Sequence, residues 1–189
     1  SENGCTGGSG RGYELNPFKT SHYVIGVTPP SITEVSRNPT VPTSTESPVI
    51  ECKVEDFDGS VASVRLFYTN DILANAFDSV DFTLVGGSSS EFTATIPAYA
   101  DGDMVGYYIK AVDNDGNISQ NPVTPASQTA KNTHVYTVRD NGLTIVDIQK
   151  VLDYNNDLSY YQGDTVTVTG VVSASAKDFD LGYVYIQQT

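Results

Sequence analysis

Apolar and polar residues alternate in several short runs between positions 49 and 138. In the first run, Val49–Glu55, the residues Ile50, Cys52 and Val54 fall on one face of an extended chain. Alternation of this kind is typical of a half-buried β-strand. The pattern recurs in five further segments, which are Val61–Tyr68, Val80–Val85, Phe92–Ile96, Met104–Val112 and Thr133–Val138. We therefore expect six or seven strands around one core.

The residues expected to face inward come from alternate positions of these segments. They are Ala62, Val64, Leu66 and Tyr68, then Val80, Phe82 and Leu84, and then Val105, Tyr107, Ile109 and Ala111. The last segment contributes the neighbouring apolar residues Val135 and Tyr136. Turns rich in Asp, Gly and Ser separate the strands at intervals of roughly 8–12 residues, which is typical of an antiparallel sandwich. The predicted fold class is therefore all-β.

The flanking parts of the chain differ in composition and suggest the domain limits. The stretch Ser1–Gly12 is rich in glycine, Tyr23–Val27 predicts a short strand, and Ser31–Ser47 contains prolines that suit an edge strand or a linker. We expect residues 1–29 to be a tail or the remnant of a preceding domain. The sandwich should occupy residues 30–139, and a second β module should follow in residues 140–189, with a hinge over Arg139–Gly142 where they meet.

Two stretches resemble immunoglobulin-like (fibronectin type III-like) modules of large secreted or surface proteins of bacteria. They are VEDFDGSVASVRLFY and EFTATIPAYADGDMVGYYIKAVDNDGN. The resemblance covers roughly residues 30 to 139 and implies a sandwich of this module type, but it does not indicate a function. Tyr107 stands where an antibody domain has its second cysteine, and Val105 stands where fibronectin type III modules keep a tyrosine. The usual disulfide between the sheets is therefore not expected.

The last fifty residues resemble the start of an oligonucleotide/oligosaccharide-binding-like (OB-like) barrel. The phrases that carry the resemblance are LTIVDIQ, YYQGDTVTVTGVVSASA and LGYVYIQQ. Gly163–Val172 should form a long strand that bends near Gly170, as barrel strands do. Only part of such a barrel is present, so its last strand, Tyr183–Gln187, should expose an edge that another chain or segment covers.

The charge of the chain excludes some partners. With 23 acidic and 10 basic residues, the formal net charge is −13. Such a field repels phosphate backbones, so we expect no nucleic-acid partner. No stretch approaches the ~18 apolar residues of a membrane span, so we expect no membrane insertion. The location predicted from the resemblance is extracellular or on the bacterial cell surface.

Acidic turns supply the one candidate metal site. The turns DFDGS and DNDGN should lie at the same end of the sandwich and bring together Asp56, Asp58, Asp113 and Asp115. Four carboxylates repel one another unless a cation or water separates them, and oxygen-rich loops suit calcium. The favoured interpretation is nevertheless a pair of solvated turns without a cofactor, because Asp and Asn cap their own backbone and Gly supplies a positive φ. An EF-hand is excluded because the closing Glu is absent.

The sequence contains few residues or motifs that are typical of a catalytic site. His22 and His134 lie in separate strands, and no G-x-S-x-G elbow or phosphate-binding glycine loop is present. We therefore assign no catalytic residue. Cys52 is expected to be a buried thiol, while a disulfide with Cys5 stays open because sequence does not give the distance between them.

The sequence leaves two main functions open, besides that of a linker made rigid by calcium. The first is a non-catalytic structural, adhesion or spacer module of a larger bacterial surface or secreted protein, with neighbouring domains or another protein chain as partners. The alternative is a set of accessory domains of a secreted hydrolase, such as a nuclease or phosphatase, whose catalytic domain lies outside this chain. The 12 tyrosines leave a carbohydrate ligand open, although core packing explains most of them better.

Overall fold

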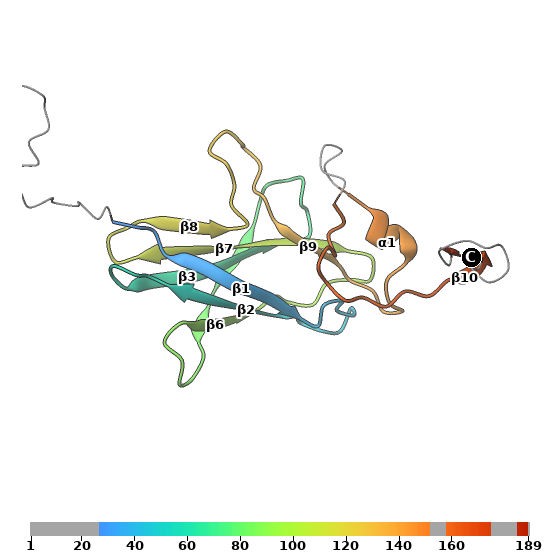
Figure 1. The fold of residues 1–189 in the computed structure, drawn as a ribbon, viewed down its shortest axis with the longest axis horizontal. Coiled ribbons are helices and arrows are strands. Elements are labelled where there is room, and N and C mark those ends of the chain that lie inside the picture. Colours follow the sequence, from blue (N-terminus) through green and yellow to red (C-terminus); the bar gives the residue numbers. More distant parts are fainter. Residues whose placement is uncertain (1–26, 152–157, 175–184, 189) are drawn as a thin grey trace, which may run out of the picture.

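The computed structural model describes residues 27–151, 158–174 and 185–188 (Figure 1). Several expectations fall outside these residues. They concern the tail Ser1–Gly12, the first four residues of the strand expected over Tyr23–Val27, the position of His22, the pairing of Cys5 with Cys52, and Tyr183.

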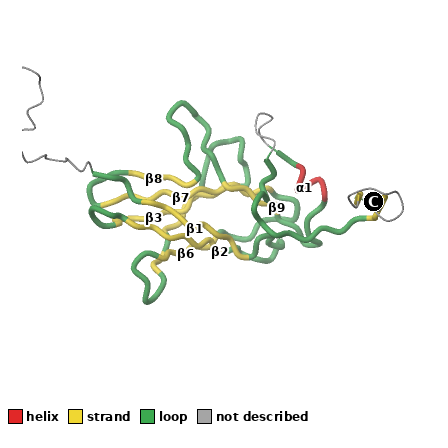
Figure 2. Tube along the Cα trace, in the orientation of Figure 1, coloured by secondary structure: helices red, strands yellow, loops and turns green. Residues whose placement is uncertain are grey.

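Residues 27–138 form nine strands in two antiparallel sheets that pack face to face (Figures 1 and 2). The first sheet contains, in spatial order, β1 (Ser31–Asn38), β2 (Val49–Glu55), β6 (Glu91–Thr95) and β5 (Thr83–Leu84). The second contains β4 (Asp78–Asp81), β3 (Val61–Thr69), β7 (Met104–Asp113) and β8 (Ile118–Asn121), with β9 (His134–Thr137) also paired to β7. The predicted all-β class and sandwich architecture are confirmed.

The core lies between the sheets and is built from alternate positions of the strands, as predicted. Its members are Ile50, Cys52, Val54, Val64, Leu66, Ala94, Ile96, Val105, Tyr107, Ile109, Ala111, Tyr136 and Val138. Each large side chain buried there stabilises the fold by about 1.5–3 kcal/mol relative to an exposed one. Cys52 is buried as a thiol, and burial raises its pKa to about 12.

A bulge at the start of β3 changes which residue faces the core. The register between β3 and β7 shifts between Val61 and Ser63. Ala62 is consequently exposed, and Val61 packs against the core in its place. The prediction for Ala62 is wrong because an extra residue in a bulge reverses the alternation that precedes it.

The predicted strand Val80–Val85 is divided between the two sheets. Its first part belongs to β4, which pairs with β3, and its second part is β5, which pairs with β6. Val80 and Phe82 pack against the core as expected, but Leu84 is 47% exposed. The chain crosses the edge of the sandwich here, so one alternating pattern does not describe both halves.

Two edge strands show what the pattern could and could not identify. The Ser31–Ser47 segment contains β1, which pairs only with β2 and is therefore an edge strand, one of the two expected possibilities. The strand β8 was not predicted, because its sequence, ISQN, contains a single apolar residue. It pairs with Ile109–Val112 of β7, whereas β9 pairs with the preceding half of that strand.

The residues after β9 form a short helix and a small separate sheet. Helix α1 spans Ile145–Gln149, and β10 (Val171–Ala174) pairs with β11 (Tyr185–Gln187). The expected long strand Gly163–Val172 is wrong for most of its length, since only its last two residues belong to β10. The described residues close no barrel. None of their helices is long and apolar enough to cross a lipid bilayer.

Candidate functional site

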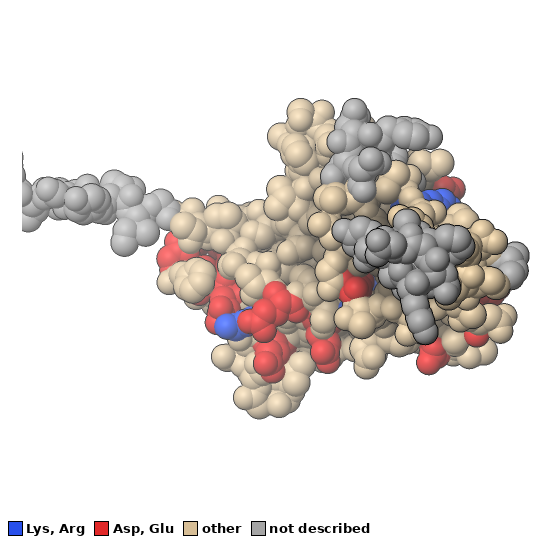
Figure 3. Space-filling view, turned by 45° about the vertical axis from the view of Figure 1, so that its right-hand side comes forward, with Lys and Arg blue, Asp and Glu red and all other residues tan. Residues whose placement is uncertain are grey.

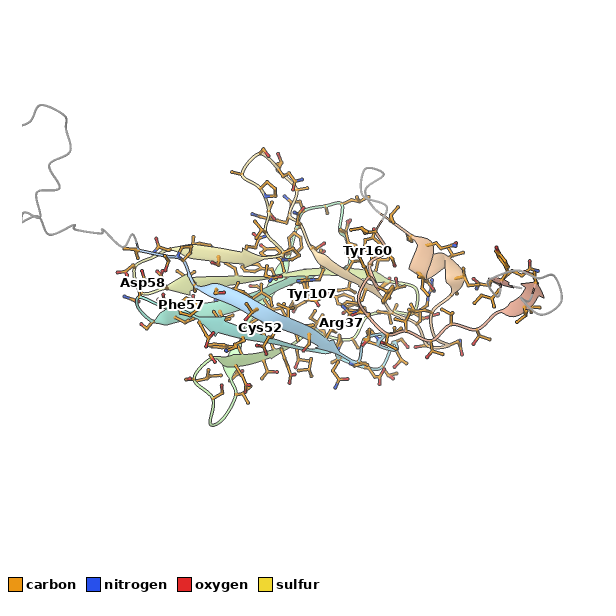
Figure 4. All side chains as sticks on the ribbon, in the orientation of Figure 1. Arg37, Cys52, Phe57, Asp58, Tyr107 and Tyr160 are labelled. Carbon is orange, nitrogen blue, oxygen red and sulfur yellow. The ribbon has the colours of Figure 1, made fainter. Side chains whose placement is uncertain are left out.

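The two acidic turns lie side by side at one end of the sandwich, where Figure 4 labels Asp58. The backbone NH of Ser60 donates to Asn114 Oδ1 at 2.7 Å, and the NH of Asn114 donates to the Ser60 carbonyl at 2.9 Å. Gly59 permits this approach, because a Cβ there would collide with Asn114 Oδ1. The structure thus brings the DFDGS and DNDGN turns together.

Asp113 uses its carboxylate within its own turn. Its Oδ1 accepts from the backbone NH of Asp115 at 2.9 Å and of Asn117 at 2.8 Å, and its Oδ2 accepts from Asn117 Nδ2 at 2.8 Å. Desolvation opposes the charged form of Asp113, but the bonds from Asn117 outweigh it and lower the pKa. This is the self-capped bend that Asp, Asn and Gly form without a metal.

The remaining candidate ligands differ in their surroundings. Asp58 accepts from the backbone NH of Thr28 at 2.9 Å and from its hydroxyl at 2.8 Å, and these bonds lower its pKa. Desolvation raises the pKa of Asp56, and the nearby charges of Asp58 and Asp113 act in the same direction. Asp115 is exposed. Among the described residues, no three His, Cys, Asp or Glu side chains are grouped to hold a metal ion, and calcium binding stays a prediction.

A second candidate site is a polar cleft of about 250 Å³ toward the other end of the sandwich. Figure 4 labels three of its residues, Arg37, Tyr107 and Tyr160, well away from Asp58. The cleft lies between β1, β9 and the segment that follows α1. Its lining consists of Val35, Ser36, Arg37, Thr40, Tyr107, His134, Val135, Tyr160, Gln162 and Asp164.

Arg37 is the buried charge of this cleft, with a side chain only 7% exposed. Its Nε and Nη2 donate to the Thr40 carbonyl at 3.0 and 2.7 Å, and its Cζ lies 4.8 Å from the centre of the Tyr136 ring. The second charge is Asp164, whose Oδ2 lies 3.8 Å from Arg37 Nη2. That distance is too long for a direct hydrogen bond.

His134 is neutral at pH 7 in this setting. Its Nε2 lies 2.9 Å from Asn121 Oδ1, and Asn121 Nδ2 donates to the Ile32 carbonyl at 3.2 Å. The amide orientation makes Oδ1 an acceptor, so Nε2 carries the proton and Nδ1 the lone pair. Burial, together with the Arg37 charge, lowers the pKa of His134 to about 4.

Two tyrosine hydroxyls at the cleft stay protonated at neutral pH. Burial raises the pKa of Tyr160 to about 12 and raises that of Tyr107 as well. The Tyr160 hydroxyl is buried and has no hydrogen-bond partner among the described residues. Tyr107 belongs to the core, as the sequence predicted, whereas Tyr108 on the outer face is covered by stacking on Phe67 at 4.8 Å.

The chain after β9 is bonded back onto the sandwich through residues 137–151 and 158–161, which we call the joint. Arg139 Nε and Nη2 donate to the two carboxylate oxygens of Asp147 at 2.9 and 2.6 Å. Asp147 also accepts from the backbone NH and the hydroxyl of Thr144, the N-cap of α1. The Tyr161 hydroxyl accepts from the Thr137 NH at 2.9 Å.

Hydrogen bonds also fix the turn at Asp140 within the joint. Asp140 accepts from the Ser44 NH at 2.7 Å and from the Ser44 hydroxyl at 2.9 Å, and its own NH donates to Asp101. Gly142 has φ +79°, the left-handed conformation expected for the Asn141–Gly142 pair. The predicted hinge position therefore contains a bend with several anchors on each side.

The sequence did not identify Arg37, Arg139 or Asp147 as functional residues. Nothing in a proline-containing edge segment signals that an arginine will be buried. The one available signal for the joint was Thr144 followed three residues later by an acid, which is a capping-box spacing. The partner arginine lies before the helix and could be identified only from the fold.

Comparisons with known proteins give partial structural matches only. No protein-family model and no curated protein matches the chain. A cycloalternan-degrading enzyme from Trueperella pyogenes matches 55% of this chain and 12% of its own at 17% identity, with TM-score 0.38. Its complex with isomaltose matches 45% and 10% at 20% identity, with TM-score 0.34. Its covalent-intermediate complex matches 45% and 14% at 16% identity, with TM-score 0.33. At these scores the likeness gives no information about activity.

Proposed function

We propose that the chain is a non-catalytic, immunoglobulin-like spacer of a larger extracellular bacterial protein, which holds the segment after it in a fixed position. The strand order supports the module type. The order β1-β2-β6-β5 in one sheet, facing β4-β3-β7 with β8 and β9 in the other, agrees with that of immunoglobulin-like sandwiches. The neighbouring domains of the same polypeptide are then its main partners.

The single observation that carries this proposal is the joint. A spacer transmits position only if the connection to the next segment is stiff. The bidentate pair of Arg139 and Asp147 is the strongest geometry available to a salt bridge, and the Asp147 side chain is only 6% exposed. The pair anchors α1 to the residue two positions after β9, and the Tyr161 bond to Thr137 anchors residue 161 to the end of that strand.

The state of the reactive side chains supports a role without catalysis. The Cys52 thiol is buried and protonated at pH 7, and His134 is neutral and bonded to Asn121. Nucleophilic catalysis requires a base within hydrogen-bond reach of the nucleophile. Among residues 27–151, the two groups stand apart, because Cys52 lies in the core and His134 lies at the polar cleft.

A second candidate function is that of an accessory domain in a secreted hydrolase. The observation that favours it is the polar cleft, which a purely mechanical spacer does not need. Reading the coding region around these 189 residues separates the two functions. Repeated copies of the module favour a fibre or adhesin, whereas a neighbouring domain with paired acids and a histidine favours the hydrolase.

The joint is tested by ¹⁵N relaxation of the whole chain in solution. We expect amides of α1 to report the same rotational correlation time as amides of β2 and β7. Asp147→Asn should give α1 faster internal motion while β2 and β7 are unchanged. The matched control is Asp81→Asn, which breaks the exposed pair of Asp81 with Arg65 with the same change of charge.

Two results would contradict the proposal. One is independent motion of α1 in the unmodified chain. The other is turnover of phosphodiester, phosphomonoester or glycoside substrates by the purified chain at a rate that heat unfolding abolishes. Turnover of that kind would place catalysis within these residues and exclude a passive spacer.

A further inference from the structure

The polar cleft has a balanced charge. Arg37 contributes a positive and Asp164 a negative charge, and His134 is neutral at pH 7. An anion that approaches Arg37 meets the Asp164 carboxylate, and a cation that approaches Asp164 meets the guanidinium. In a partly desolvated site an added net charge is costly unless it is paired, so a neutral ligand suits this cleft best.

The polar groups of the cleft require a ligand that both donates and accepts. The 3.8 Å separation of Arg37 Nη2 and Asp164 Oδ2 is too long for a direct bond. A hydroxyl placed between the two atoms accepts from the guanidinium and donates to the carboxylate at ordinary distances. A ligand with several hydroxyls can make this bridge and still have donors and acceptors for the remaining lining residues.

The Tyr160 hydroxyl adds a further observation, because it is buried at the cleft without a partner. Native structures rarely leave a buried hydroxyl unpaired, and such a group calls for a ligand or a water. With a volume of about 250 Å³, the cleft is below the roughly 300–1,000 Å³ of sites for drug-sized ligands. It therefore has room for one ring and not for an extended chain.

We propose that this cleft binds a neutral polyhydroxylated ring, such as the terminal unit of a saccharide, between Arg37, Tyr160 and Asp164. Hydroxyls of the ring bridge the guanidinium and the carboxylate, and one of them pairs with the Tyr160 hydroxyl once that side chain turns toward the cleft, because the hydroxyl is closed to solvent here. The lining of the cleft is almost entirely polar, so hydrogen bonds and not ring stacking hold the ligand. This binding site is separate from the Arg139–Asp147 pair and goes beyond the proposed spacer role.

The test is an NMR titration of the whole ¹⁵N-labelled chain. The probes are the methyl glycosides of glucose, galactose and mannose, with glucuronate as the charged comparison. We expect at least one neutral glycoside to give saturable shifts in the millimolar range. The shifts should concentrate at residues 35–40, 134–135 and 160–164.

Two substitutions in the cleft and one outside it make the titration specific. Tyr160→Phe removes only the unpaired hydroxyl, and Asp164→Asn removes only the charge of the carboxylate. Each should weaken the binding of the glycoside about ten-fold, the size expected for one lost hydrogen bond. Tyr108→Phe removes a hydroxyl on the outer face of the second sheet and should leave the binding unchanged. Melting temperatures of all three variants should stay close to that of the unmodified chain.

Three outcomes would overturn the proposal. The first is the absence of saturable shifts with every neutral glycoside, which leaves water as the occupant of the cleft. The second is tighter binding of glucuronate that Asp164→Asn strengthens, which identifies an anion site. The third is a set of shifts outside the cleft. None of these affects the relaxation of α1, so a failure here is distinguishable from a failure of the spacer proposal.

Discussion

Of the buried tyrosine hydroxyls in the part of the chain that the structure describes, that of Tyr136 has no hydrogen-bond partner and that of Tyr161 has one. The Tyr136 hydroxyl is buried without a partner among the described residues, although its ring lies under the Arg37 guanidinium. The Tyr161 hydroxyl accepts from the Thr137 NH at 2.9 Å. Burying a hydroxyl without a partner is unfavourable, whereas removing a hydroxyl that has one leaves the other group unpaired. The two positions therefore form a matched pair for mutation.

We expect Tyr136→Phe to leave the free energy of unfolding unchanged or to raise it by up to about 1 kcal/mol, and Tyr161→Phe to lower it by about 1–3 kcal/mol. The first substitution removes an unpaired polar group and keeps the ring under Arg37. The second leaves the Thr137 NH without its acceptor. Urea unfolding at pH 7 measures both, and equal destabilisation by the two substitutions would contradict the assignment.

Single residues could be predicted from the sequence where burial follows from alternation. Cys52 and Tyr107 lie in the core, as their positions in alternating runs indicated. Arg37 could not be predicted, because a charged residue in an edge strand is normally solvated. Its burial depends on the Thr40 carbonyl and the Tyr136 ring, which only the folded chain brings to it.

The joint shows how a very short element can be stable. Helix α1 has five residues, far fewer than the ~12–15 that an isolated helix needs in water. Its stability must come from tertiary contacts and from the capping box of Thr144 and Asp147. Asp147 serves both purposes, since the same carboxylate bonds the helix N-terminus and Arg139.

The pKa of Asp147 makes the joint sensitive to acid. Burial opposes ionisation, but the bonds from Arg139 and Thr144 outweigh it and lower the pKa to about 2. A depressed carboxyl pKa stabilises the folded state above the unfolded value near 4, and this contribution is lost as the pH falls toward 2. We expect about 2 kcal/mol of stability to disappear over this range.

This loss is measured by urea unfolding between pH 5 and pH 2. Asp147→Asn should lower stability at pH 5 and flatten the acid slope relative to the unmodified chain. Asp81→Asn serves as the control, because its ion pair with Arg65 is exposed. An acid slope that Asp147→Asn leaves unchanged would show that other carboxylates dominate the pH dependence.

Elements with regular alternation were predictable, and irregular ones were not. The strand β2 has the bounds that the pattern indicated, and β7 differs from its predicted segment by one residue. The strand β8 escaped prediction because pairing with β7, and not an apolar face, defines it. Helix α1 escaped because five residues are too few to display a helical period.

At the scale of the whole molecule, acidic residues dominate the surface. Acidic side chains clearly outnumber basic ones on the face drawn in Figure 3. Among the described residues, three ion pairs are at 3.0 Å or less, formed by Arg65 with Asp81, Arg139 with Asp147 and Lys53 with Glu55. Each joins one acid to one base and leaves the net charge of −13 unchanged, so the excess acidic side chains repel one another in the compact state.

Screening by salt and specific binding of calcium predict different changes of the melting temperature. Raising NaCl from 0.01 to 1 M shortens the Debye length from about 30 to 3 Å, so we expect the melting temperature to rise. Calcium at matched ionic strength should raise it no further, because the Asp58 and Asp113 carboxylates already accept hydrogen bonds from Thr28, Asp115 and Asn117.

One result of the calcium experiment would contradict this expectation. A rise several degrees beyond the effect of NaCl, reversed by a chelator, would identify a bound cation instead of screening. If Asp58→Asn abolished that extra rise and Asp101→Asn did not, the cation would belong to the paired acidic turns. Asp101 is the matched control because its turn precedes β7 while Asp113 ends that strand, so the two acids lie at opposite ends of the sandwich. Calorimetry with NaCl, CaCl₂ and chelator at one ionic strength therefore separates a general property of the charged surface from a specific site.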